Sequence, residues 1–202
     1  HDINGWIEVL THGSHNAVLA RLYQMLHERK QWCHVADGLG EVLKAIGDQW
    51  KMGALTIAEE HIASETLTRA LTHVGSGLPV TVSTRRAVLA TVEGDPHELG
   101  LRLAELCLRA RQWEPVWLGR DTPTEVLSDN IKNDNFDVVA LSASAYGVNT
   151  KKLAFHAGRI AEVCRAQGVL LVLGGMGSWP EVEGAVHVRT FSEFDTLLER
   201  VF

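Results

Sequence analysis

Residues 95–100 read Asp-Pro-His-Glu-Leu-Gly, directly after the apolar run Ala87–Val92 and directly before a helical pattern. A histidine at the carboxyl end of a strand can offer a neutral ring nitrogen to a metal, and an aspartate two residues earlier can hold its other nitrogen. The glycine lets a bulky planar ligand approach the backbone. The same six residues are also compatible with an ordinary turn and helix cap. The spacing therefore predicts either a ligand site centred on His97 or a plain strand-to-helix connection.

From about residue 86, short apolar runs alternate with helical patterns, which is typical of parallel strands joined by helices. The expected strands are Ala87–Val92, Val116–Leu118, Val138–Leu141, Leu170–Leu173 and Ala185–Val188. The expected helices begin near Glu98, Thr122, Asn149, Ser178 and Ser192. The predicted fold class is therefore α/β, with a five-stranded parallel sheet of the Rossmann-like, flavodoxin-like kind. Such sheets bind ligands over the carboxyl ends of their strands, where His97, Ser142 and Gly174 fall.

The N-terminal part of the chain lacks strand alternation and has helical spacing instead. Apolar residues recur at i, i+3, i+4 and i+7 in Asn16–Lys30 and again in Val35–Met52. Thr56 opens a capping box, which predicts the start of a further helix. We expect a four-helix bundle here. Residues 75–79 read Gly-Ser-Gly-Leu-Pro and predict a linker, so the expected domains are a helical bundle over 1–77 and a Rossmann-like domain over 78–202.

Composition excludes several functions. The net charge of −6 and the absence of a dense Lys/Arg stripe argue against direct nucleic-acid binding by this chain. No apolar run approaches the roughly 20 residues of a membrane span. Three isolated cysteines, Cys33, Cys107 and Cys164, indicate a reducing compartment without a disulfide framework, so we expect a cytoplasmic protein.

Two polar residues fall on the apolar stripe of the helix that starts after Thr56. Glu60 and His61 share that stripe with Leu67 and Leu71, and buried polar groups there would need partners. Trp50, ten residues before Glu60, could line one cavity with them above the sheet. The alternative is a first-turn glutamate that favours the helix dipole and a histidine satisfied by a nearby carbonyl.

The strand-end motifs together resemble the cobalamin-binding motif of the corrinoid proteins. The residues that carry this resemblance are Asp95, His97, Gly100, Ser142, Gly174 and Gly175. The resemblance implies that His97 is the lower axial ligand of cobalt and that the cofactor's benzimidazole tail enters the cleft beside Ser142 and Gly174. One departure is that the family has Ser/Thr-x-Leu or a close variant at the end of its third strand, whereas here Leu141 precedes Ser142.

Trp50, followed after nine residues by Glu60 and His61, resembles the Trp-x9-Glu-His signature of CarH-type cobalamin photoreceptors. The resemblance implies that Trp50 packs on an adenosyl group above cobalt, that Glu60 hydrogen-bonds its ribose, and that His61 shapes the upper face and the adjacent interface. Many of these photoreceptors have a histidine directly after the tryptophan, where this chain has Lys51. A permanent second-histidine adduct after illumination is therefore not expected.

Two function classes follow from these resemblances. The first is a non-enzymatic light sensor that binds adenosylcobalamin, forms a homo-oligomer (dimer or tetramer), and passes its signal to an effector that the sequence does not identify. The alternative is a corrinoid methyl carrier, which needs no adenosyl-binding glutamate, so Trp50 and Glu60 favour the sensor. A flavodoxin-like or dinucleotide-binding domain is disfavoured because residues 174–177, Gly-Gly-Met-Gly, are not GxGxxG and follow the fourth strand.

The first 61 residues are rich in tryptophan and histidine. The residues concerned are Trp6, His12, His15, Trp32, Cys33 and His34. Ordinary bundle core and polar surface would explain them. They would also suit a second planar chromophore, a bilin such as biliverdin, as in the standalone photocobilins that this chain is similar to.

Overall fold

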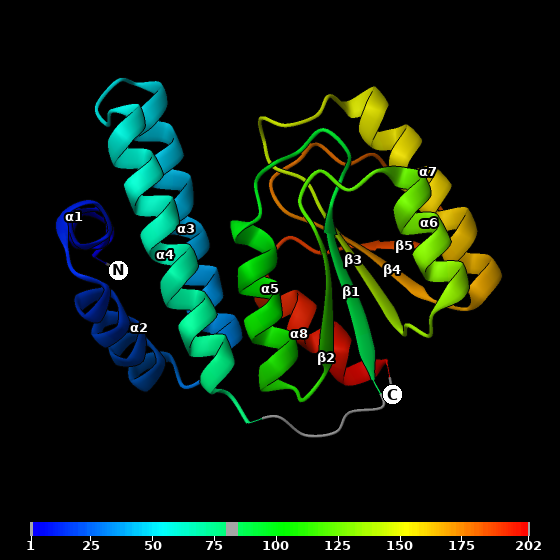
Figure 1. Cartoon of the computed structure of the whole chain (residues 1–202), viewed down its shortest axis with the longest axis horizontal. Coiled ribbons are helices and arrows are strands. Elements are labelled where there is room, and N and C mark those ends of the chain that lie inside the picture. Colours follow the sequence, from blue (N-terminus) through cyan, green and yellow to red (C-terminus); the bar gives the residue numbers. More distant parts are fainter. Residues whose placement is uncertain (1, 80–84, 202) are drawn as a thin grey trace.

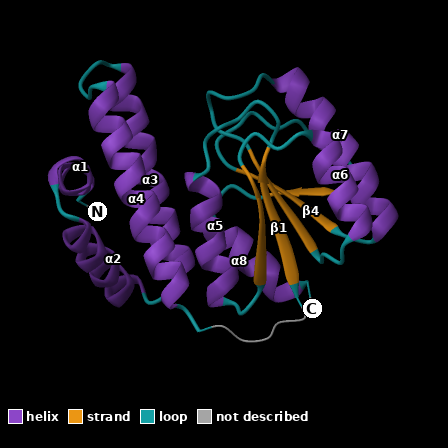
Figure 2. Cartoon of the chain, in the orientation of Figure 1, coloured by secondary structure: helices purple, strands orange, loops and turns teal. Residues whose placement is uncertain are grey.

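The computed structural model describes residues 2–79 and 85–201, and these form a helical bundle beside an α/β domain (Figures 1 and 2). The bundle consists of α1 (Ile3–His12), α2 (His15–Arg29), α3 (Trp32–Lys51) and α4 (Ile57–Gly77). The strands are β1 (Arg86–Thr91), β2 (Glu114–Gly119), β3 (Val138–Ser142), β4 (Leu170–Gly174) and β5 (Ala185–His187). The remaining helices are α5 (Leu99–Ala110), α6 (Thr124–Asn133), α7 (Thr150–Gln167) and α8 (Phe191–Arg200).

The bundle helices begin and end where local chemistry satisfies their free backbone groups. Ser14 caps α2 through its side chain, and Thr56 with Glu59 forms the predicted capping box of α4. The predicted four helices are confirmed. However, α4 is longer than the sequence predicts, since it runs through Gly75 and ends at Gly77. Gly75 is buried and packs against α5, so the helix is held by tertiary contact where its sequence predicts a linker.

The five strands are all parallel and lie in the order β2-β1-β3-β4-β5, which is the flavodoxin-like order. The predicted fold class is therefore confirmed. Alternate residues of β1 enter two different cores: Ala87 and Leu89 pack with the bundle, α5 and α8, whereas Val88 and Ala90 pack with α6 and α7. The bundle thus shares one continuous hydrophobic core with one face of the sheet.

Four of the five expected helix starts agree with the structure to within two residues, but the helix expected near Ser178 is absent. Residues 175–184 form a loop instead. The indole of Trp179 folds back and donates to the carbonyl oxygen of Gly174 at 2.7 Å, and Pro180 follows it directly. Since β5 begins at Ala185, the connection is too short for a packed helix.

The tip of the α3–α4 hairpin rises beyond α1 and α2, at the end of the molecule where the loops after the strands gather (Figure 1). Functional side chains from the bundle and from the strand ends can therefore meet at this end. None of the helices in the described ranges is both long enough and apolar enough to cross a membrane.

Candidate functional site

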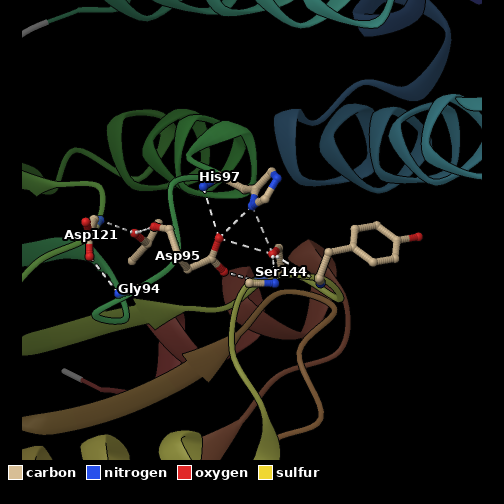
Figure 3. Close-up of polar contacts among 8 residues, drawn as sticks. Gly94, Asp95, His97, Asp121 and Ser144 are labelled. Carbon is tan, nitrogen blue, oxygen red and sulfur yellow. Dashed lines mark hydrogen bonds and ion pairs between the residues drawn. The ribbon is translucent and has the colours of Figure 1, made fainter. Parts of the chain in front are cut away.

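The loop between β1 and α5 is fixed by hydrogen bonds from its neighbours. The Asp95 carbonyl oxygen accepts from the Thr91 hydroxyl at 2.5 Å and from the backbone N–H of Asp121 at 3.0 Å. The side chain of Asp121 accepts in turn from the N–H of Gly94 at 2.6 Å. These contacts, drawn in Figure 3, bury Asp95 completely and present the following residues at the carboxyl end of the sheet.

His97 is held by Asp95, as its sequence spacing predicts. Nδ1 of His97 lies 2.7 Å from Oδ1 of Asp95, and the same oxygen accepts from the backbone N–H of His97 at 3.0 Å (Figure 3). The Asp95 carboxylate accepts a hydrogen bond from Nδ1–H of the imidazole, so Nε2 carries the free lone pair. Because the side chain is 54 % exposed, an approaching ligand can reach that nitrogen.

Burial, hydrogen bonds and nearby charges shift the pKa values of Asp95 and His97. Burial acts to raise the pKa of Asp95, but the hydrogen bonds from His97 and Ser144 outweigh it and lower that pKa below its usual range. The hydrogen bond with Asp95 raises the pKa of His97 against the effect of partial burial, and the negative charge of Glu60 acts in the same direction. The site therefore keeps Asp95 ionised and makes His97 more basic than an isolated histidine.

Ser144 completes this network, although the sequence pattern did not predict it. Its backbone N–H donates to Oδ2 of Asp95, and its hydroxyl lies 3.1 Å from Oδ1 of Asp95 and 3.1 Å from Nδ1 of His97 (Figure 3). Ser144 stands where the family pattern Ser/Thr-x-Leu has its leucine, counted from Ser142. That substitution of a polar for an apolar residue was the available signal.

Small residues surround Ser142 at the next strand ends. Ser142 pairs in register with Gly174, and a Cβ on Gly100 would lie 3.5 Å from the Ser142 hydroxyl. Gly175 has a φ of +84°, and a Cβ there would collide with the Ala143 carbonyl and lie 2.8 Å from the same hydroxyl. The Ser142 hydroxyl forms no hydrogen bond within the part of the chain that the structure describes. The structure thus brings these predicted residues together around a free hydroxyl.

Glu60 and His61 of the bundle border a cavity of about 430 Å³ together with His97. Ser64 and Thr68 of α4 and Arg120 of the loop after β2 also line this cavity. The prediction that the stripe carrying Glu60 and His61 faces the core is wrong for His61, whose side chain is 75 % exposed, whereas the Glu60 side chain is only 28 % exposed. His61 is exposed because the first turns of α4 lie at the α3–α4 tip, which extends beyond α1 and α2 (Figure 1).

Trp50 lies at the end of α3 and is not among the residues that line this cavity. Its side chain is exposed, so it is open to a ligand placed over the strand ends. The neighbouring Lys51 places its Nζ 3.9 Å from the centre of the Tyr146 ring, in the loop after β3. The bundle tip and the β3–α7 loop are therefore in direct contact at the site's edge.

These residues fit a cobalt corrinoid by three observations. A free imidazole nitrogen is oriented by a carboxylate, a hydroxyl without a partner stands among glycines, and a carboxylate faces the same cavity from the bundle. No group of three or more His, Cys, Asp or Glu residues in the described ranges could chelate a metal unaided.

Three of the six residues that suggested a bilin lie in the bundle interior, and the three histidines do not. Trp6, Trp32 and Cys33 are all buried in the hydrophobic core, and the Arg21 guanidinium lies 5.1 Å from the Trp6 ring. His15 and His73 contact each other edge to face with ring centres 5.7 Å apart. Core packing thus accounts for the two tryptophans and the cysteine.

Comparison with known proteins agrees with this geometry. The chain is 33 % identical over 125 residues to the HTH-type transcriptional repressor CarA of Myxococcus xanthus. The aligned region covers 61 % of this chain and 42 % of CarA. The chain is 26 % identical over 112 residues to Dimethylamine corrinoid protein 2 of Methanosarcina acetivorans. That aligned region covers 54 % of this chain and 52 % of the corrinoid protein. The chain spans about half the length of these curated relatives.

The fold has a close counterpart among solved structures. The monomethylamine corrinoid protein of Methanosarcina barkeri matches with a TM-score of 0.73 and 16 % identity, over 98 % of this chain and 97 % of that chain. This likeness concerns the fold alone. A family model described as B12 binding domain matches residues 85–201, and a second model with the same description matches residues 3–74. The chain therefore belongs to the B12-binding domain family.

Proposed function

We propose that this chain is a light sensor that binds adenosylcobalamin with its benzimidazole tail displaced and His97 on cobalt. The observation that carries the proposal is that a carboxylate of the bundle, Glu60, faces the same cavity as His97. A ribose above the corrin needs a hydrogen-bond acceptor of this kind, whereas a methyl group does not. When bound, adenosylcobalamin supplies a cobalt–carbon bond that visible light breaks.

The chain's own residues divide the work of binding between two domains. Nε2 of His97 would hold the metal, while Asp95 and Ser144 keep the imidazole ring in place through Nδ1. The predicted small residues leave room for the displaced tail beside a free hydroxyl. These are Gly100, Ser142, Gly174 and Gly175. From above, Trp50 offers a stacking face and Glu60 a ribose acceptor, with His61 beside it.

A corrinoid methyl carrier remains the alternative, because relatives named as dimethylamine corrinoid proteins match this chain and the fold resembles the monomethylamine corrinoid protein. A carrier would use His97 in the same way. It would gain nothing from Glu60, because a methyl group has no donor for a carboxylate. The preference for the adenosyl over the methyl form of the cofactor therefore separates the two functions.

The test is a visible absorption spectrum of the protein loaded with adenosylcobalamin, recorded before and after green light, together with titrations of both cobalamins. We expect a light-dependent spectral change and tighter binding of adenosylcobalamin than of methylcobalamin. Glu60→Gln should reduce the preference by about 1.5–3 kcal/mol, the effect of losing a charge-assisted hydrogen bond. Equal affinities for the two cobalamins in the parent would instead favour the methyl carrier.

We also propose that the protein is a homo-oligomer whose assembly responds to light. Loss of the adenosyl group would leave a cavity beneath Trp50 and beside Glu60, and the bundle would repack to fill it. Repacking of the bundle would change the contacts of a subunit interface on it, and the altered assembly would act on a downstream effector without any catalysis by this chain. Identical size-exclusion and light-scattering profiles in the dark and after illumination would argue against this.

We also propose that the protein binds a second chromophore, a bilin such as biliverdin. With Trp6 and Trp32 in the core, biliverdin would have to bind reversibly against the bundle surface, where histidines such as His12 and His15 can contact its propionates. Adding biliverdin to the cobalamin-loaded protein should produce a red-shifted band that comigrates with the protein. A band identical to free biliverdin and removed by desalting would leave a cobalamin-only sensor.

A further inference from the structure

Glu60 is anchored at both of its carboxylate oxygens. Oε1 accepts a hydrogen bond from the hydroxyl of Ser64 at 2.7 Å, and Oε2 lies 2.7 Å from Nδ1 of His61. The Glu60 side chain retains 28 % of its exposed surface and borders the cavity that also contains His97. A carboxylate has about four lone-pair positions, so two remain for a ligand in the cavity.

The two anchors differ in strength. The His61 ring is largely exposed, and water competes for its nitrogens. Ser64 is half-buried one helical turn further along α4, and its short side chain loses little rotamer freedom when it is ordered. A glutamate loses much more, so a glutamate that is already ordered binds a donor at a lower entropic cost. Ser64 is therefore the firmer of the two supports.

We propose that Ser64 is a positioning residue that selects for the adenosyl form of the cofactor by holding the Glu60 carboxylate toward the cavity. This inference rests on the proposed function. Ser64 acts on the ligand through Glu60, so its effect should be confined to ligands that carry a ribose. A cobalamin with a methyl upper ligand gives Glu60 nothing to accept, and its affinity should not depend on Ser64.

The experiment measures dissociation constants of adenosylcobalamin and methylcobalamin by spectral titration in the dark for the full chain. Ser64→Ala removes the anchor, and Ser64→Thr keeps a hydroxyl at the same position. The matched control is Thr72→Ala on the same helix, because the Thr72 hydroxyl donates at 2.8 Å to the backbone carbonyl of Thr68 and has no contact with Glu60. Thermal unfolding of each cobalamin-free variant confirms that it is folded.

We expect Ser64→Ala to lower the adenosyl-to-methyl affinity ratio about three- to tenfold, with methylcobalamin affinity unchanged. Ser64→Thr and Thr72→Ala should retain the parent ratio. If Glu60→Gln lowers the ratio but Ser64→Ala does not, the role of Ser64 is refuted while the proposed function stands. If Ser64→Ala weakens both cobalamins equally, Ser64 is merely structural and the inference is wrong. A parent protein without any adenosyl preference would instead contradict the proposed function itself.

Discussion

Asp37 links the bundle to the α/β domain, and its removal should destabilise the whole chain. Asp37 lies on α3, yet its carboxylate accepts from the backbone N–H of Phe191 at 2.6 Å and from that of Ser192 at 3.2 Å, at the start of α8. The Ser192 hydroxyl also donates to it. A carboxylate at a helix N-terminus satisfies free N–H groups and interacts favourably with the helix dipole.

The size of the effect follows from what remains at this helix end. α8 keeps its own cap, since the Thr190 hydroxyl accepts from the N–H of Glu193 at 3.0 Å. Asp37→Ala therefore removes two backbone contacts to a charged acceptor but not the whole cap. We expect a loss of about 2–3 kcal/mol in the free energy of unfolding. For a chain of this length that corresponds to a fall in melting temperature of roughly 4–12 °C.

The assay is urea and thermal unfolding followed by circular dichroism, with hydrogen exchange at the amides of Phe191 and Ser192. Asp37→Asn keeps one acceptor oxygen and should lose only about half as much stability. Asp129→Ala is the control, because the ion pair of Asp129 with Lys132 is exposed and its loss should change stability by no more than about 0.5 kcal/mol. If Asp37→Ala also stays within about 0.5 kcal/mol of the parent, with unchanged exchange, the link contributes nothing and the reasoning fails.

Three further predictions concern the site and the thiols. His97→Ala should weaken cobalamin binding strongly and shift the spectrum toward an unligated lower face, as titration would show. Because Asp95 raises the pKa of His97, a proton competes with the metal below that pKa, so affinity should fall up to about tenfold per pH unit on acidification, with no such slope in His97→Ala. Burial raises the pKa of all three thiols, that of Cys164 to about 12, so an alkylating reagent at pH 8 should modify them only after unfolding, as mass spectrometry would show.

Continuous apolar runs predicted the central strands because these strands bury both faces. β1 and β3 are buried along almost their whole length, and continuous apolar runs of this kind identify parallel strands directly. The helix expected near Ser178 failed because a turn-forming signal does not specify how much chain follows before the next strand. Trp179 and Pro180 close that connection as a loop.

The site was predictable where it depends on strand ends and unpredictable where it depends on loops. His97, Ser142 and Gly174 meet because carboxyl ends of parallel strands share one edge of the sheet. Ser144 lies beyond the end of β3, where the chain has turned toward Asp95, and alternation along a strand no longer says which way a side chain points. The exposure of His61 likewise depends on how far the α3–α4 tip extends beyond α1 and α2. The apolar periodicity of α4 does not predict that distance.

The shared core explains how an event at the upper face could reach the rest of the molecule. α3 and α4 pack on α5, and α5 starts directly after the loop that carries His97. Asp37 lies in the second turn of α3, away from the α3–α4 tip, and fixes that helix to the start of α8. The α3–α4 tip contacts the α/β domain through Lys51 and the ring of Tyr146, so a change of contacts near Glu60 would act first on that contact. In the proposed sensor, a rearrangement would therefore begin at the hairpin tip, where the Trp50 side chain is exposed.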